Sequence, residues 1–394
     1  MPDIDYPIYD ADNHFYEPEE ALTTYLPKKF AKDFRYVEVN GRKKLVINGR
    51  LSEYIPNPTF EVIARPGAHE PWFRATNTEG KTLRELTGKP IKCLDAYRRP
   101  EPRVKLMDEQ GLATAMMFPT LASTVEVNLS TDHEVVHAVI HSLNEWIFDV
   151  WTFNYEDRIF TTPIVTLMDV DLAVKELEYC LERGAKTVLV RPAPVPGYRG
   201  GRSLAWEEFD PFWARVAEAG IYVSMHASDS GYEQLAQSWI GSGEMLPFKP
   251  DVFRAMLAPS DRAIADTCAA LICHGVFHRN PTLKVASIEN GSSWVRDLLE
   301  RFDHVYGQMP GEFHEHPRTT FARHIWVAPF YEEPLDQLAE MIGVERILFG
   351  SDYPHPEGLA NPLDFLAEVE CFGPADQRAI MSDNLKGLLA GVKL

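Results

Sequence analysis

The sequence predicts an α/β fold, a distorted (β/α)8 TIM barrel, and three observations support this prediction. Short apolar stretches alternate about eight times with segments of helical periodicity. The apolar stretches are continuous, which is typical of parallel strands that are covered on both faces. The chain has 394 residues, enough for a barrel that carries loop insertions. A doubly wound open sheet is the alternative, and the lack of a G-x-G-x-x-G or P-loop sequence disfavours it.

The expected elements follow one another in strand–helix order. The expected strands cover residues 8–14, 112–118, 159–167, 187–190, 221–226, 283–289, 325–328 and 346–350. The expected helices cover residues 103–110, 132–153, 172–183, 206–219, 262–277, 294–306, 335–342 and 376–389. Gly111, Gly184 and Gly220 each end a helix, because glycine readily takes the left-handed conformation of a helix C-terminus. Asp132 or Thr131 is the expected N-cap of the second helix.

Two loop insertions are expected, after strands 1 and 5. Residues 19–93 are irregular and rich in proline, asparagine and aromatic residues, with a hairpin expected around Asn40-Gly41. Residues 228–249 are polar and rich in glycine. A further loop, which is rich in histidine and proline and is not one of the two insertions, is expected at 307–323. Residues 1–394 are therefore interpreted as one barrel domain with its main insertion at about 19–93.

Composition restricts the classes of partner. The net charge of −19 argues against nucleic acid and anionic membranes as partners. No stretch approaches the ~18 apolar residues of a membrane span. The five cysteines are odd in number and have no C-x-x-C spacing, which is typical of a reduced protein. With no signal-peptide pattern at the N-terminus, we expect a cytoplasmic protein.

Metal-binding side chains end several of the expected strands. Asp12 and His14 are two residues apart, so both side chains lie on one face of the first strand. His226 ends the fifth strand, Glu289 the sixth and Asp352 the eighth, with His355 just beyond. In a barrel these ends meet at one mouth, and carboxylates and imidazoles are ligands for zinc, manganese or iron(II). For Asp12 the alternative is a helix-capping role.

Other histidines are interpreted as structural. His133, His137 and His141 share one helix face, so a metal site is conceivable there. They stand among apolar residues, and the rest of the segment offers no further ligand, which favours a packing role. His274 and His278 follow a helix away from the expected mouth and are also interpreted as structural.

The two end motifs together resemble a known family. Tyr9-Asp10-Ala11-Asp12-Asn13-His14 and Gly350-Ser351-Asp352-Tyr353-Pro354-His355 are similar to motifs of the amidohydrolase superfamily. The branch they resemble is the decarboxylase-like one, related to aminocarboxymuconate semialdehyde decarboxylase, and the resemblance covers most of the chain. It implies a metal held by Asp12, His14, His226 and Asp352, with Asp12-x-His14 replacing the usual H-x-H.

Two departures from the family pattern affect the expected chemistry. Glu289 stands where a histidine is common after strand six, and Arg191 ends strand four in place of a bridging lysine. A lysine-bridged dinuclear site is therefore not expected. Glu289 and His355 remain candidates for a second metal, because a few relatives look like two-metal iron or manganese oxygenases.

Each candidate residue has a proposed role and an alternative. Asp352 is expected to be a ligand and to take the proton of a metal-bound water, or else to cap the following loop. Glu289 is a ligand, a general base or a structural carboxylate. His355 contacts substrate, binds a second metal or orients a ligand. Arg191 binds a substrate carboxylate, or forms an ion pair with an acid such as Glu289.

The first functional hypothesis is a metal-dependent hydrolase or carboxy-lyase acting on a small organic acid. Zinc is the first expectation for the metal, with manganese or iron as alternatives and one or two ions per chain. The second hypothesis is a two-metal oxygenase on the same barrel, and the third is a non-catalytic subunit. A homodimer is expected, with the insertion before Cys93 as interface. A hetero-oligomer with a homologous subunit is the alternative.

Overall fold

The computed structural model describes residues 4–52, 55, 57–197, 200–232, 237–239, 252–257 and 259–391. Its centre consists of two parallel sheets. The first has the order β1 (Ile8–Phe15), β7 (Leu112–Pro119), β8 (Ile159–Thr161). The second has the order β12 (Ile325–Val327), β11 (Lys284–Ile288), β10 (Tyr222–His226), β9 (Thr187–Leu189). All their strands point the same way, so their carboxyl ends lie on one side.

Isolated bridges link the two sheets at both edges. Ile164, which follows β8, bridges Leu189 of β9, and Val327 of β12 bridges Ile347. The following Phe349 accepts a hydrogen bond from Ala11 of β1 at 2.8 Å. Backbone contacts therefore connect the two sheets at both of their edges.

Two predicted strands are shorter than expected. The predicted strand 159–167 stops at Thr161, because Pro163 has no N–H to donate to a neighbouring strand. The predicted strand 346–350 is not a ladder strand. A 3-10 turn occupies Val344–Arg346, and only single bridges connect the residues after it.

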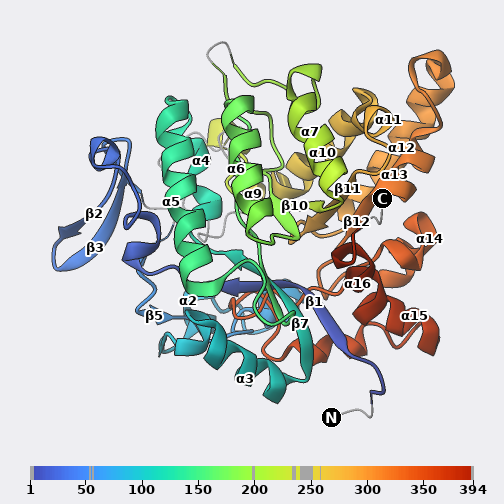
Figure 1. The fold of residues 1–394 in the computed structure, drawn as a ribbon. Helices are drawn as coiled ribbons and strands as arrows, with labels where there is room; N and C mark the ends of the chain where they lie inside the picture. The colour runs from blue at the N-terminus through green and yellow to red at the C-terminus, as the bar shows by residue number, and fades with distance from the viewer. Residues whose placement is uncertain are drawn as a thin grey trace.

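Helices surround the sheets (Figure 1). They are α3 (Pro100–Gln110), α4 (Glu126–Leu129), α5 (His133–Trp151), α6 (Val170–Glu182), α7 (Asp210–Ala219), α9 (Val252–Leu257), α10 (Pro259–Cys273), α11 (Val276–Arg279), α12 (Ser293–Gln308), α13 (Pro317–His324), α14 (Leu335–Ile342), α15 (Pro374–Arg378) and α16 (Asn384–Leu389). Asp132 caps α5 and accepts from the backbone N–H of Glu134, as predicted. Gly111 and Gly220 end α3 and α7 in the left-handed conformation.

Two helical predictions need correction. The predicted helix 262–277 is divided into α10 and α11, because Gly275 has φ +74° between them. The predicted loop 307–323 contains α13. That helix starts with Pro317, and the ring of His316 accepts a hydrogen bond from the N–H of Arg318 at 3.3 Å.

The first insertion carries a small antiparallel sheet. The predicted hairpin is present as β2 (Phe34–Val39) and β3 (Arg42–Ile47), with β4 (Arg50–Ser52) beside it. Asn40 and Gly41 form its turn with φ of 52° and 71°. The hairpin projects from the rest of the molecule in Figure 1. The insertion continues with β5 (Val62–Ile63), α1 (Glu70–Phe73), α2 (Leu83–Thr87) and β6 (Ile91–Lys92). Most of the expected insertion 228–249 lies outside the described residues.

The described helices include none that is long and apolar enough to cross a membrane. All five cysteines have free thiols, three of them buried. Polar side chains are buried along β1, among them Asp10, Asn13 and His14.

Candidate metal centre

Donor atoms from three strands meet in one cluster. The Nε2 atom of His226 lies 2.9 Å from Oε2 of Glu289 and 3.2 Å from Nε2 of His14. Oδ1 of Asp12 lies 3.4 Å from Nε2 of His14 and 3.4 Å from Nε2 of His226. These four residues come from β1, the end of β10 and the residue after β11. The structure therefore brings together side chains that are more than 270 residues apart in sequence.

Asp352 and His355 adjoin the same cluster. Oδ1 of Asp352 lies 3.4 Å from Nε2 of His14 and 2.6 Å from Nδ1 of His355. The His355 ring stacks on the His14 ring with 3.9 Å between centroids, and its Nε2 lies 3.1 Å from the Thr120 hydroxyl. His14, Glu289, Asp352 and His355 form a second group of potential ligands that overlaps the first.

Local backbone geometry turns the ligands inward. The pairing of β1 with β7 is irregular between Asp10 and Asn13, so the strand bends next to Asp12. Glu289 and Asp352 have φ of 54° and 53°, a conformation that few non-glycine residues adopt. Such backbone strain concentrates at functional sites, where the surrounding structure holds it in place.

The cluster fits a divalent metal ion. Its donor–donor distances of 2.9 to 3.6 Å match ligands that each lie about 2.0–2.2 Å from one ion. Oδ1 of Asp12 is buried and has no hydrogen-bond donor in the described part of the chain. As metal ligands the carboxylates would be ionised and the imidazoles neutral, and the negative charge of such a buried set would be offset by a divalent cation.

The pKa values of the ligands show the same need for positive charge. Burial lowers the pKa of His226, but the charges of Glu289 and Asp12 outweigh it and raise this pKa to about 10. Burial opposes ionisation of Glu289, but His226 and His14 hold the pKa of its carboxyl below its usual range. Burial and the charge of Glu289 raise the pKa of Asp352 well above its usual value.

Two buried residues that the sequence analysis did not identify support the ligands. Asp10 accepts hydrogen bonds from the N–H groups of Asp12 (3.1 Å) and Ser351 (3.0 Å). It also accepts from the Asn13 amide (2.5 Å) and the Ser351 hydroxyl (2.6 Å). Arg103, fully buried, donates to Asn13 Oδ1 at 2.5 Å. The spacing of Asp10, Asp12 and His14 was the available signal for Asp10. Nothing local marks Arg103.

A cavity of about 180 Å³ adjoins the cluster of potential metal ligands. Asp12, Glu289 and Asp352 form part of its lining. The remaining wall includes Phe330, Tyr331, Glu332 and Glu357 from the segments after β12 and after Asp352. The cavity therefore opens directly beside three of the potential ligands.

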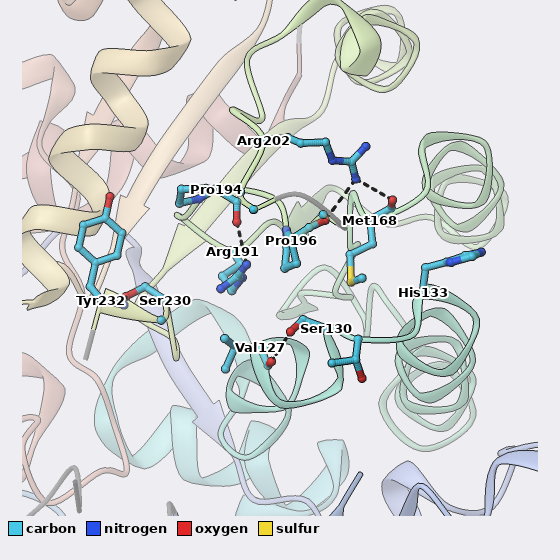
Figure 2. Close-up of a pocket in the computed structure, with 15 residues that line it drawn as sticks. Val127, Ser130, His133, Met168, Arg191, Pro194, Pro196, Arg202, Ser230 and Tyr232 are labelled. Atoms are coloured by element: carbon cyan, nitrogen blue, oxygen red, sulfur yellow. Dashed lines mark hydrogen bonds between the residues drawn. The ribbon is translucent and has the colours of Figure 1, made fainter. Parts of the chain in front are cut away.

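Arg191 lies in a different pocket, of about 1140 Å³ (Figure 2). Its Nη2 atom donates to the carbonyl of Pro194 at 2.9 Å, and Nη1 donates to the carbonyl of Asp229 at 3.3 Å. Its Nε lies 3.6 Å from Oε1 of Glu126. The expected acid partner, Glu289, is therefore replaced by Glu126. No residue of the metal cluster lines this pocket, and the structure gives Arg191 no contact with that cluster among the described residues.

Four of the histidines that were interpreted as structural have identifiable partners. His137 accepts a hydrogen bond from the N–H of Asp169 at 3.3 Å, and His141 contacts Glu176 at 2.8 Å. His274 bonds the hydroxyl of Ser203 at 2.9 Å. His278 stacks on another histidine ring with 3.5 Å between centroids. None of them joins a metal-binding group in the described part of the chain.

Comparison with known proteins identifies relatives over nearly the whole chain. The amidohydrolase family model matches residues 10–384. The crystal structure of an amidohydrolase from Mycobacterium avium subsp. paratuberculosis is 43% identical in sequence, with a TM-score of 0.93 and 99% of each chain covered.

More distant similarities are to named decarboxylases. The 2-amino-3-carboxymuconate-6-semialdehyde decarboxylase of Dictyostelium discoideum is 23% identical over 258 residues, and the match spans 61% of this chain and 64% of that protein. A dihydroxybenzoic acid decarboxylase from Polaromonas sp. JS666, with bound manganese, is 16% identical with a TM-score of 0.58, covering 98% of this chain and 97% of that one. At this identity the structural likeness shows a shared fold alone.

Proposed function

Because the chain belongs to the amidohydrolase family, we propose that it is a metal-dependent enzyme that decarboxylates a small organic acid. The observation that carries this proposal is the convergence of Asp12, His14, His226, Glu289 and Asp352 on one set of donor atoms. The named activities of the distant relatives support a carboxy-lyase.

Asp12, His14, His226 and Glu289 would hold a divalent metal, with Asp352 at its edge. A bound divalent metal supplies a Lewis acid that orients a carboxylate and lowers the pKa of a bound water. Zinc is the metal proposed first. The excess of carboxylate donors suits manganese equally well, and manganese is the metal in the Polaromonas decarboxylase.

Asp352 is proposed to deliver the proton, with His355 as its hydrogen-bond partner. Decarboxylation breaks a carbon–carbon bond, leaves its electron pair on the substrate carbon and releases carbon dioxide. The carboxyl group of Asp352 then protonates that carbon and regains a proton from solvent water, while Nδ1–H of His355, 2.6 Å away, holds the carboxyl group in position by a hydrogen bond. Burial lowers the pKa of His355 well below its usual value, so its imidazole is neutral at pH 7 and Nδ1–H donates to Asp352.

Two measurements on the full-length protein test this proposal. Elemental mass spectrometry on protein purified without chelator is expected to find one zinc or manganese ion per chain. Screening of small aromatic and unsaturated acids in H₂¹⁸O is expected to give carbon dioxide with no ¹⁸O in the remaining product. Incorporation of ¹⁸O into that product would identify a hydrolase, and a protein that binds no metal after reconstitution would refute the proposal.

A two-metal oxygenase is the second candidate, because His14, Glu289, Asp352 and His355 form a second overlapping donor set. This candidate requires about two iron or manganese ions per chain and substrate-dependent oxygen uptake. A single ion at saturation would eliminate it.

We also propose that the linked sheets form the distorted (β/α)8 barrel of one domain. The bridges from Ile164 to Leu189 and from Val327 to Ile347 support this interpretation. The homodimer proposed from the sequence would use the insertion that carries the β2–β3 hairpin. Light scattering that gives a monomeric mass would contradict it.

A further inference from the structure

The first insertion supplies part of the wall of the cavity beside the cluster of potential metal ligands. Phe73, the last residue of α1, lines this cavity. The other described lining residues come from β1, from the segments that follow β10, β11 and β12, and from the segment that contains Asp352. Among the described residues, Phe73 is therefore the only one that the insertion contributes to the cavity wall.

Phe73 stands between the cavity and solvent. Its relative exposure is 42%, whereas that of Asp12 is 3% and that of Tyr331 is 5%. All the other described lining residues are buried or half-buried. A side chain that borders a cavity and is also open to solvent separates the two. The ring of Phe73 therefore forms part of the mouth of the cavity.

The hydrophobic core does not include the Phe73 ring. This side chain belongs neither to the core nor to the apolar side chains that pack against it. A ring in this position gains little from folding, because much of its surface stays in contact with water. Removal of the ring is therefore expected to leave the fold intact, so that its effect on the cavity can be measured separately.

Backbone hydrogen bonds hold the start of α1 against the segment that follows Asp352. The N–H group of Gly67 donates to the carbonyl of His355 at 3.2 Å, and the N–H group of His69 donates to the carbonyl of Pro356 at 2.7 Å. The insertion is thus attached directly to the chain that borders the cluster of potential ligands.

Arg74 holds the other end of α1. Its Nε and Nη2 atoms each lie 2.8 Å from a carboxylate oxygen, those of Glu70 and Glu368. Its guanidinium lies over the ring of Tyr331, 4.7 Å from the ring centroid, and Tyr331 also lines the cavity. Because both ends of this short helix are attached, the backbone of Phe73 is fixed at the mouth of the cavity.

The enclosed space is small. Its volume of about 180 Å³ corresponds to about six water molecules at ~30 Å³ each, and pockets for drug-sized ligands have ~300–1,000 Å³. We propose that Phe73 is a specificity-determining residue, whose ring covers the mouth of the cavity and limits the size of the acid that can reach the metal cluster. This inference rests on the proposed function and adds the residue that selects the substrate by size.

Two rigid carboxylates of different length test the inference on Mn²⁺-loaded, full-length protein. The probes are benzoate and biphenyl-4-carboxylate. Paramagnetic relaxation of the probe protons by Mn²⁺ reports binding near the metal and yields Kd by titration. Wild-type protein is expected to bind benzoate at least about tenfold more tightly, because the second ring of the longer probe would meet the ring of Phe73.

Variants assign the discrimination between the two probes to Phe73. Phe73→Ala is expected to reduce it to about threefold or less, through tighter binding of biphenyl-4-carboxylate with little change for benzoate. Phe73→Tyr retains a ring at this position and should keep the full discrimination. Phe253→Ala is the matched control, because Phe253 on α9 has a similar exposure of 44% and does not line the cavity; it should also keep the full discrimination.

Several results would overturn the inference. These are equal binding of the two probes by the wild type, full discrimination in Phe73→Ala, loss of discrimination in Phe253→Ala, or failure of both probes to bind near the Mn²⁺ ion. A chain that binds no Mn²⁺ would instead refute the proposed function, so the two failures are distinguishable.

Discussion

Substitution of Asp10 by asparagine tests how the metal ligands are held in place. Asp10 is fully buried and joins β1 to the segment that carries Asp352. One of its oxygens accepts from the N–H groups of Asp12 and Ser351, and the other accepts from Asn13 and the Ser351 hydroxyl. An asparagine has one acceptor oxygen and one donor NH₂, so it cannot satisfy four donors.

The cost follows from the better of the two amide orientations. With the oxygen toward the backbone N–H groups, the new NH₂ faces the NH₂ of Asn13. Asn13 cannot flip to accept, because its Oδ1 already accepts from Arg103 at 2.5 Å. The Ser351 hydroxyl can rotate to accept. One or two hydrogen bonds to a charged acceptor are lost, which is worth about 2–4 kcal/mol.

Urea denaturation of the metal-free protein at pH 8 measures this loss. Burial raises the pKa of Asp10 to about 7, so most of the wild-type carboxyl is ionised at that pH. Metal affinity, measured by competition with a fluorescent chelator, is expected to fall about 10–100-fold, the usual effect of losing a group that orients a ligand. Asp297→Asn, an exposed position on α12, is the control.

Wild-type values of both the unfolding free energy and the metal affinity in Asp10→Asn would refute this reasoning. A loss of stability with unchanged metal affinity would show that Asp10 supports the fold without orienting Asp12.

Three further predictions concern other residues. His226→Ala removes the partner 2.9 Å from Glu289 and is expected to weaken metal binding by at least about a hundredfold, as measured by chelator competition; an unchanged affinity would remove His226 from the ligand set. Burial lowers the pKa of His137 to about 4. The unfolded chain therefore binds more protons, and stability falls as the pH drops from about 6.5 to 4. His137→Gln should remove up to about 3 kcal/mol of that fall in urea titrations across this range, and identical pH profiles would contradict it. In Gly358→Ala the new Cβ would lie 2.6 Å from the carbonyl oxygen of Ser351, so calorimetry should show a lower Tm and the metal affinity should drop. Gly387→Ala, which has open space, should show neither.

The candidate ligands could be predicted from the sequence because a barrel brings the carboxyl ends of its strands together. The carboxyl ends of parallel strands meet on one side, so each strand-end residue is a candidate without any knowledge of packing. Asp12, His14, His226, Glu289 and Asp352 were found in this way, and the structure brings them together. Their roles as ligands stay predictions until a metal is measured.

Loop and edge elements were harder to predict. A single proline shortened the predicted strand 159–167, and the left-handed Gly275 divided the helix predicted at 262–277. In the predicted loop 307–323, α13 is only eight residues long, and so short a periodic pattern is weak.

By itself, the sequence determined the strand–helix alternation, the hairpin at Asn40-Gly41 and the residue types at the strand ends, because these depend on local periodicity and turn chemistry. Only the tertiary structure decided the partners of those residues. Asp10 meets Ser351 across 341 positions of sequence, and Arg191 meets Glu126 rather than Glu289. The cavity wall to which Glu332 and Glu357 belong also exists only in the folded chain. Contacts of this kind depend on how distant segments pack, and no local pattern encodes that packing.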